Sequence, residues 1–200
     1  MGVSQLLEIP KFYSTFERLV SGDARTTFVQ QYVRPQPGDR LLDIGCGPAD
    51  ILDTLPPGID YTGFDPSERY IANAQRRFGQ RGRFYCRGIV AGRNEELSDF
   101  DLVLACGVLH HLDDSQVIDL FSLGNAVLKS GGRLITIDGC LVPGQSRIAS
   151  FLLGQDRGQF VRTEAAYLAL ARKVFGSVTS HVRHDLMRIP YTHLIIEMRP

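Results

Sequence analysis

The sequence contains no tryptophan, only 4 cysteines, and no excess of either charge, because 22 Lys and Arg residues balance 22 Asp and Glu residues. A neutral chain lacks the surplus of cations with which non-specific nucleic-acid binders displace counterions from phosphates. The cysteines form no Cys-x-x-Cys pair and have no histidine at zinc-ligand spacing. We therefore expect reduced thiols, no metal site and no nucleic-acid partner.

Long apolar runs are also absent. No stretch approaches the roughly 18 apolar residues of a membrane span, and the segment from Met1 to Pro10 lacks a cationic start followed by an apolar run. These absences predict a cytoplasmic protein with no membrane span and no export signal. They leave the oligomeric state open.

The length of 200 residues and a hydrophobic fraction of 44% favour a single domain. We expect residues 1–38 to form an N-terminal helical cap, since Phe12, Phe16 and Leu19 share one helical face and the segment ends at a proline-rich turn. Residues 39–200 are expected to form a sheet domain. Within it, residues 140–162 show no clear period, which is typical of a lid or binding loop.

Short apolar runs bounded by Gly, Pro or Asp alternate with helical patterns from Arg40 onward, as in β-α-β units around a parallel sheet. The expected strands are Arg40–Ile44, Tyr61–Phe64, Arg83–Cys86, Asp101–Ala105 and Arg133–Ile137. A helix from about Glu164 to Phe175 then leads to two strand-like runs, 177–186 and 191–198. The short link between these runs fits only an antiparallel hairpin.

The first strand is followed by Gly45-Cys46-Gly47, with Asp43 just before the turn. Glycine permits positive φ and lets the backbone approach a bound molecule, and a helix after the turn would present N–H groups. The dinucleotide-binding fingerprint requires a third glycine where this chain has Asp50. The turn therefore predicts a ligand cradle of another kind.

A second carboxylate, Asp65, ends the next strand and precedes Pro66-Ser67. At this position a carboxylate can accept hydrogen bonds from both hydroxyls of a ribose, each worth about 1.5–3 kcal/mol. Alternatively, Asp65 only caps the helix that begins at Pro66. Both roles are compatible.

Together these motifs resemble the class I S-adenosylmethionine-dependent methyltransferases. The resemblance is carried by Leu42–Gly47, Asp65, Phe100–Ala105 and Leu128–Leu134, in family order and spacing from about Arg40 to Asp138. It implies a Rossmann-like three-layer α-β-α fold of the α/β class. The mostly parallel seven-stranded sheet would have the order 3-2-1-4-5-7-6 and end in an antiparallel C-terminal hairpin.

The resemblance also implies S-adenosyl-L-methionine as cofactor, with S-adenosyl-L-homocysteine as product. The turn Gly45, Cys46 and Gly47 would lie beside the methionine part with Asp43 behind it, and Asp65 would hold the ribose. Pro66 and Ser67 would lie near the adenosine, and Cys106 near the methionine end. Arg25 would pair with the cofactor carboxylate, although an arginine at a helix start is also a common solvated surface charge.

One departure from the family pattern concerns adenine. Many relatives carry Gly-Asp-Ala after the third strand, whereas this chain has Gly88-Ile89-Val90. Adenine recognition would then rest on Ile89 and Val90 through apolar packing and backbone groups, unless Arg93 or Asn94 substitutes for the missing aspartate.

A histidine pair, His110-His111, follows the fourth strand, where ligands bind in open α/β sheets. Plant small-molecule O-methyltransferases, which this region resembles, have a catalytic base at the position of His110. We expect His110 to be the base, with His111 as the weaker candidate. The alternative is that these imidazoles bond backbone carbonyls and fix the loop.

The predicted function is in-line methyl transfer to a small-molecule acceptor under residues 140–162. There, Arg157 and Arg162 either bind the acceptor or form ion pairs with Asp156 and Glu164. The functional alternatives are a non-catalytic S-adenosylmethionine-binding protein, a methyltransferase acting on protein or nucleic acid, and an NAD-dependent oxidoreductase. The sequence leaves open the acceptor and the atom that is methylated.

Overall fold

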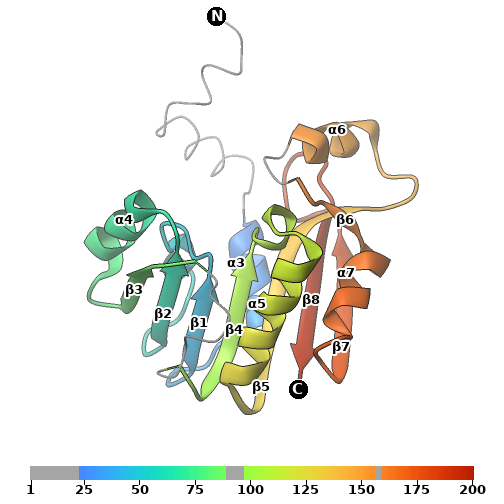
Figure 1. Ribbon diagram of the computed structural model, residues 1–200. Coiled ribbons are helices and arrows are strands. Elements are labelled where there is room, and N and C mark those ends of the chain that lie inside the picture. Colours follow the sequence, from blue (N-terminus) through green and yellow to red (C-terminus); the bar gives the residue numbers. More distant parts are fainter. Residues whose placement is uncertain (1–22, 89–96, 156–158) are drawn as a thin grey trace, which may run out of the picture.

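The computed structural model describes residues 23–88, 97–155 and 159–200. Its core is one mixed sheet in the strand order β3-β2-β1-β4-β5-β8-β7, with a short strand β6 attached to β5 (Figure 1). The strands are β1 (Arg40–Ile44), β2 (Asp60–Asp65), β3 (Gly82–Cys86), β4 (Phe100–Cys106), β5 (Leu128–Leu141), β6 (Arg162–Thr163), β7 (Ser177–Arg183) and β8 (His193–Arg199). Because β6 lies off the main path, this order is the predicted 3-2-1-4-5-7-6.

The strands from β3 to β5 are parallel, while β8 is antiparallel to both β5 and β7. The C-terminal hairpin is therefore confirmed. Parallel strands end at the same edge of a sheet, so the turns after β1, β2 and β4 lie together. This edge is where the sequence predicts a ligand site.

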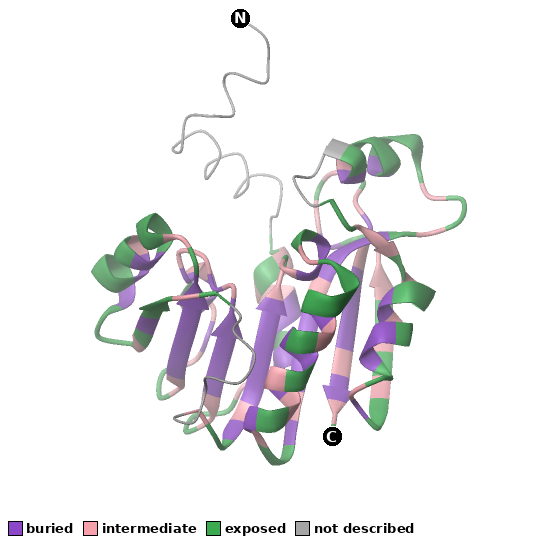
Figure 2. Ribbon diagram, viewed as in Figure 1, coloured by how far each residue is buried: buried purple, intermediate pink, exposed green. Residues whose placement is uncertain are grey.

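Helices cover both faces of the sheet. One face carries α3 (Ala24–Phe28), the π-helix η1 (Val29–Val33), the 3-10 helix η2 (Asp50–Asp53) and α4 (Glu68–Phe78). The opposite face carries α5 (Asp114–Val127) and α7 (Glu164–Ala171). The central strands β1, β2, β4 and β8 are mostly buried between these layers, whereas the edge strands β3 and β7 are largely exposed or half-buried (Figure 2). This gives the expected α-β-α arrangement.

Local sequence explains the helix ends. The Asp113 side chain accepts from the Gln116 N–H while the Gln116 side chain accepts from the Asp113 N–H, which is a capping box at the start of α5. Ser67 accepts from Tyr70 N–H at the start of α4. The expected N-terminal helical region is described only from residue 23 and ends at Arg34, whose φ of +46° is left-handed.

The helix expected after the glycine turn is present as the four-residue 3-10 helix η2. Two other sequence expectations require correction. The fifth strand was expected over Arg133–Ile137, but β5 extends over Leu128–Leu141. The segment 140–162 contains a helix, α6 (Arg147–Gln155). The sequence pattern does not predict it, because the exposed apolar residues Ile148 and Phe151 weaken the helical period.

No helix in the described ranges is long and apolar enough to cross a membrane.

Candidate functional site

The turn after β1 is built around two glycines with left-handed backbone. Gly45 and Gly47 have φ values of +73° and +53°. A Cβ atom on Gly45 would lie 2.6 Å from Val108 Cγ2, whereas one on Gly47 would meet no heavy atom within 4 Å. The N–H groups of Gly45 and Cys46 both donate to the Phe64 carbonyl at 2.8 Å. The turn is therefore fixed to β2, and Gly47 borders open space.

Asp65 links this turn to the start of α4. Its Oδ2 accepts from the Gly47 N–H at 2.9 Å, and its Oδ1 accepts from the Ser67 N–H at 2.8 Å. The residue is 8% exposed. Each carboxylate oxygen can accept two hydrogen bonds, so each has capacity for one more donor. The role at the helix start is thus observed, and it leaves room for ligand hydroxyls.

Asp43 lies deeper, with 3% of its surface exposed. Its Oδ2 accepts from the Tyr61 hydroxyl at 2.7 Å, while Oδ1 is buried without a hydrogen-bond partner in the part of the chain that the structure describes. Burial raises the pKa of this carboxyl to about 6, and Asp65 adds to the rise. A buried oxygen of this kind is costly unless a donor or cation reaches it.

Two cavities open at this edge of the sheet. The first cavity, of about 590 Å³, lies among the turns after β1, β2 and β4 and reaches α5. The second cavity, of about 800 Å³, lies among α3, η2 and α4. Gly45, Gly47 and Tyr70 line both. The two cavities are therefore neighbouring parts of one cleft, divided by the glycine turn.

Most of the predicted cofactor residues line this cleft. Asp65 and Pro66 line the first cavity, and Arg25, Asp43, Cys46 and Cys106 line the second. Ser67 contributes its N–H to Asp65 and its side chain to the start of α4. Ile89, Val90, Arg93 and Asn94 lie outside the described residues.

The two histidines occupy different positions after β4, in the 3-10 helix η3 (Leu109–His111). His110 is 6% exposed. Its ring Nδ1 lies 2.7 Å from Asp138 Oδ1, and its backbone N–H donates to the same oxygen at 3.2 Å. Burial raises the pKa of Asp138. His111 is exposed and lines the first cavity, with its ring centroid 4.1 Å from that of His110.

Arg162 holds the histidine loop rather than a ligand. Its side chain donates to the Leu109 carbonyl at 3.1 Å and the Leu112 carbonyl at 2.7 Å, and forms an ion pair with Asp114 at 2.8 Å. The side chain is only 9% exposed. The ion-pair alternative thus holds for Arg162, with Asp114 as the acidic partner, while Glu164 accepts from the Ser180 hydroxyl. Asp156 and Arg157 lie outside the described residues.

Sequence reasoning did not identify several residues that line the cleft. They are Tyr70 on both cavities, Arg87, Gln116 and Asp119 on the first, and Arg69, Arg76 and His193 on the second. The repeat of Arg69, Asn73 and Arg76 along one helical face was visible in the sequence. His193 carried no such signal, since it belongs to the distant strand β8.

Comparisons with known proteins agree with this geometry. Residues 42–134 match a family model described as a methyltransferase domain. The chain is 31% identical over 130 residues to a tRNA U34 carboxymethyltransferase of Proteus mirabilis, covering 58% of this chain and 40% of that protein. It is 34% identical over 116 residues to a ubiquinone biosynthesis O-methyltransferase of Azorhizobium caulinodans, covering 55% of this chain and 41% of that protein.

The chain thus spans about two fifths of the length of these curated relatives. Among solved structures, it is similar to a TehB-like SAM-dependent methyltransferase from Corynebacterium glutamicum, with a TM-score of 0.64 and 17% identity over 88% of each chain. At this identity the likeness concerns the fold.

Proposed function

Because residues 42–134 match a methyltransferase-domain model and the fold is similar to that of a SAM-dependent methyltransferase, we propose that the chain is a class I S-adenosylmethionine-dependent methyltransferase that transfers the methyl group of S-adenosyl-L-methionine to a small-molecule acceptor. The observation that carries the proposal is the hydrogen bond from Gly47 to Asp65, in the wall of a two-part cleft. It joins a glycine turn that can approach a ligand to a carboxylate that can accept from ribose hydroxyls.

The cleft fits this cofactor on three counts. Gly47 borders open space that a Cβ would enter, Asp65 retains hydrogen-bonding capacity, and the buried Oδ1 of Asp43 has no partner among the described residues. When bound, the cofactor supplies a methyl group on a positively charged sulfur, and its product is S-adenosyl-L-homocysteine. The turn and Asp43 would hold its methionine part, and Asp65 its ribose.

Further contacts follow from the lining of each cavity. Pro66 and Ser67 would lie by the adenosine in the first cavity, with Ile89 and Val90 proposed beside the adenine. Arg25 and Cys106 would lie at the methionine end in the second cavity. Asp50, 3.8 Å from Arg25, would compete with the cofactor carboxylate for that arginine.

The protein's own task is to align the acceptor and to accept its proton. Alignment at about 3 Å supplies much of the rate in a direct displacement. Nδ1 of His110 lies 2.7 Å from Asp138 Oδ1, and a carboxylate at this position favours the tautomer that has its proton on Nδ1 and its lone pair on Nε2. We propose His110 as the base for an acceptor hydroxyl, with His111 as the alternative because it lines the first cavity.

A small acceptor is supported by the neutral net charge and by cavities of about 590 and 800 Å³. The O-methyltransferase named for ubiquinone biosynthesis supports an oxygen acceptor. The tRNA-modifying relative keeps nucleic acid as the alternative. We propose that residues 140–162 cover the acceptor.

Cofactor binding is tested by calorimetric titration with S-adenosylmethionine, S-adenosylhomocysteine and NAD. Gly47→Ala should weaken binding of both adenosyl ligands at least tenfold, since its methyl group would enter the cleft. The matched control is Gly131→Ala, because Gly131 also has positive φ, +80°, and open space at its Cβ, but lies far from the cleft at the start of β5. Equal affinities in the two variants, or tighter binding of NAD, would refute the proposed cofactor site.

Turnover is tested by S-adenosylhomocysteine release with panels of phenolic, carboxylic and amine acceptors, and with tRNA. His110→Gln should lower kcat by about 10²–10⁴ if His110 is the base. A loss within threefold would refute that role, and the same measurement on His111→Gln tests the alternative. Tight cofactor binding without turnover on any acceptor would favour the non-catalytic alternative.

A further inference from the structure

The second cavity has a basic wall that the proposed cofactor contacts do not use. Arg69, Asn73 and Arg76 recur at intervals of four and three residues on α4, so they share one face, and all three line this cavity. The opposite face of α4 is buried in the core through Ile71 and Phe78. The sequence of α4 therefore places one side against the sheet and two guanidinium groups toward the cleft.

Two neighbouring arginines, Arg77 and Arg83, have acidic partners, whereas Arg69 and Arg76 have none among the described residues. Arg77 pairs with Asp50 and Asp53, and Arg83 pairs with Asp60 at 2.6 Å. Within residues 23–88, 97–155 and 159–200, neither Arg69 nor Arg76 has a carboxylate within 4 Å. Ion pairs within the fold therefore explain the positions of Arg77 and Arg83, but not those of Arg69 and Arg76.

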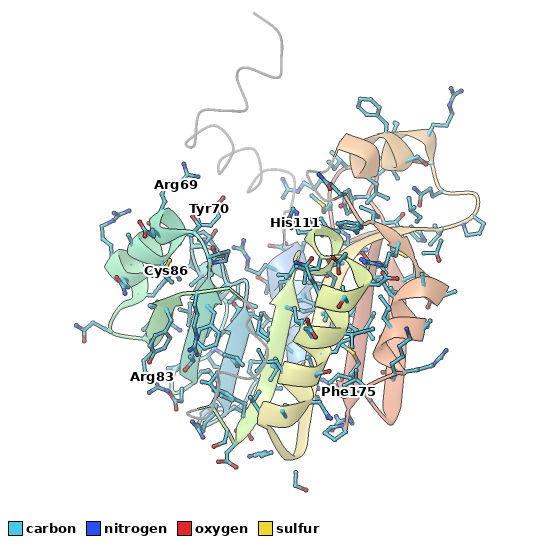
Figure 3. All side chains as sticks on the ribbon, in the orientation of Figure 1. Arg69, Tyr70, Arg83, Cys86, His111 and Phe175 are labelled. Atoms are coloured by element: carbon cyan, nitrogen blue, oxygen red, sulfur yellow. The ribbon has the colours of Figure 1, made fainter. Side chains whose placement is uncertain are left out.

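The contacts of the two side chains hold them beside the cavity. Arg76 Nη2 donates to Asn73 Oδ1 at 2.8 Å, and the Arg69 guanidinium lies 5.3 Å from the centre of the Tyr70 ring. A guanidinium has five N–H donors, so each retains donors for a ligand. Arg69 and Tyr70 lie at the same edge of the molecule as His111 (Figure 3).

Two acidic residues, Asp43 and Asp50, line the same cavity, and neither forms an ion pair with Arg69 or Arg76. Asp50 forms its ion pair with Arg77 and lies 3.8 Å from Arg25. Asp43 is buried and accepts from Tyr61. Neither carboxylate neutralises Arg69 or Arg76, so this part of the cleft is cationic although the whole chain has a net charge of 0.

We propose that Arg69 and Arg76 bind an oxyanion of the methyl acceptor, so that the acceptor is an acidic small molecule carrying a phosphate or carboxylate. Guanidinium groups match both anions through paired N–H donors. Tyr70, which is 39% exposed and lines both cavities, offers an aromatic ring to a ligand beside Arg69. This inference rests on the proposed function, because it names the substrate class of the same cleft.

A free small anion fits these observations better than a nucleic-acid backbone. The cationic side chains line a cavity of about 800 Å³, which accommodates one small molecule. A polynucleotide would require a basic track extending over the surface. Arg77 and Arg83, which would extend such a track along α4 and β3, are neutralised by aspartates.

The test uses inorganic pyrophosphate as the probe, titrated into protein saturated with S-adenosylhomocysteine. Wild-type protein should bind it, and the double variant Arg69→Gln/Arg76→Gln should weaken binding at least tenfold. The control Arg172→Gln, an exposed arginine at the end of α7 on the opposite face of the sheet, should stay within twofold. Affinity of the wild type should fall as salt is raised, because the charges are exposed.

The affinity for S-adenosylhomocysteine in the double variant separates two explanations. Unchanged affinity supports a site for the acceptor, whereas a parallel loss would assign the arginines to the cofactor carboxylate and overturn the proposal while leaving the proposed function intact. The anion-site proposal is also overturned if wild-type protein does not bind pyrophosphate, or if the double variant binds it equally well. It is overturned as well if a 12-nucleotide single-stranded RNA binds more tightly than pyrophosphate and this binding depends on the two arginines.

Failure of the proposed function is recognised separately. If wild-type protein does not bind S-adenosylhomocysteine, the methyltransferase proposal fails. The same pyrophosphate titration without cofactor then decides whether Arg69 and Arg76 form an anion site.

Discussion

Replacing Asp43 by Asn tests the electrostatics at the base of the cleft. In the folded protein this carboxyl has a pKa of about 6, against 3.8 for the unperturbed group, mainly because it is buried. The folded state therefore holds the proton more tightly than the unfolded state does. The resulting stability is complete below pH 3.8 and is lost as the pH rises through 6.

The size of the effect follows from these two pKa values. Proton linkage gives a loss of about 1.6 kcal/mol at pH 5 and about 3 kcal/mol at pH 8, hence a difference of about 1.4 kcal/mol between them. Asn cannot ionise in this range, so the stability of Asp43→Asn relative to wild type should rise by about 1.4 kcal/mol from pH 5 to pH 8. Other titrating groups, which both proteins share, cancel in this difference.

The assay is urea unfolding of both proteins at several pH values, followed by circular dichroism. The buried amide of Asp43→Asn has a cost that does not depend on pH. This cost therefore cancels when the stability difference between variant and wild type is compared from one pH to another. A stability difference that stays constant within about 0.5 kcal/mol from pH 5 to pH 8 would refute the assignment of a raised pKa to Asp43.

The same carboxyl should control ligand affinity. If a cationic group of the cofactor reaches Asp43, the ionised carboxylate is the binding form, and the dissociation constant of S-adenosylhomocysteine should rise about tenfold from pH 5 to pH 4. Asp43→Asn should bind more weakly at pH 7 and lose most of this pH dependence. A wild-type affinity independent of pH would mean that the ligand does not contact Asp43.

Two further predictions follow from other buried groups. Arg162→Ala should lower the free energy of unfolding by about 2–3 kcal/mol, because it removes the side-chain donor to the Leu112 carbonyl and one of the two donors to the Leu109 carbonyl. Chemical denaturation measures this loss, and a change below about 0.5 kcal/mol would contradict the role. Burial lowers the pKa of His193 from 6.5 to about 4, so its contribution to stability should fall by about 2 kcal/mol from pH 7 to pH 5. The variant His193→Asn should not show this fall in stability from pH 7 to pH 5. If its stability falls as much as that of the wild type, the lowered pKa of His193 is contradicted.

The sequence predicts the sheet well because its strands are short, apolar and bounded by turn residues. Arg40–Ile44 has the expected ends. The fifth strand begins earlier than expected because Leu128 pairs with Phe100. Residues 129–132 have no partner on β4 or β8, Gly131 has a φ of +80°, and the register with β4 shifts between Phe100 and Leu102. The turn residues Ser130-Gly131-Gly132 therefore interrupt the pairing inside β5, and regular pairing with β4 resumes at Arg133, where the sequence predicts the strand to begin.

The site was predictable where it depends on strand ends. Gly45, Asp43 and Asp65 follow from the topology, since parallel strands bring their carboxyl ends together. The orientations of His110 and His111 depend on one turn of 3-10 helix, whose direction the residue types do not determine. The basic wall of α4 required knowledge of which helix face the core covers.

The long strand β5 has a consequence for how such proteins diversify. It pairs with β4 as far as Ile137, with β8 as far as Gly139, and then with β6 through Cys140 and Leu141. The chain that leaves β5 and returns in β6 therefore forms an excursion whose two ends are held side by side. Because doubling the length of such a loop costs only about 0.6 kcal/mol of closure entropy, insertions here can reshape the acceptor side while the glycine turn and the sheet register stay as they are.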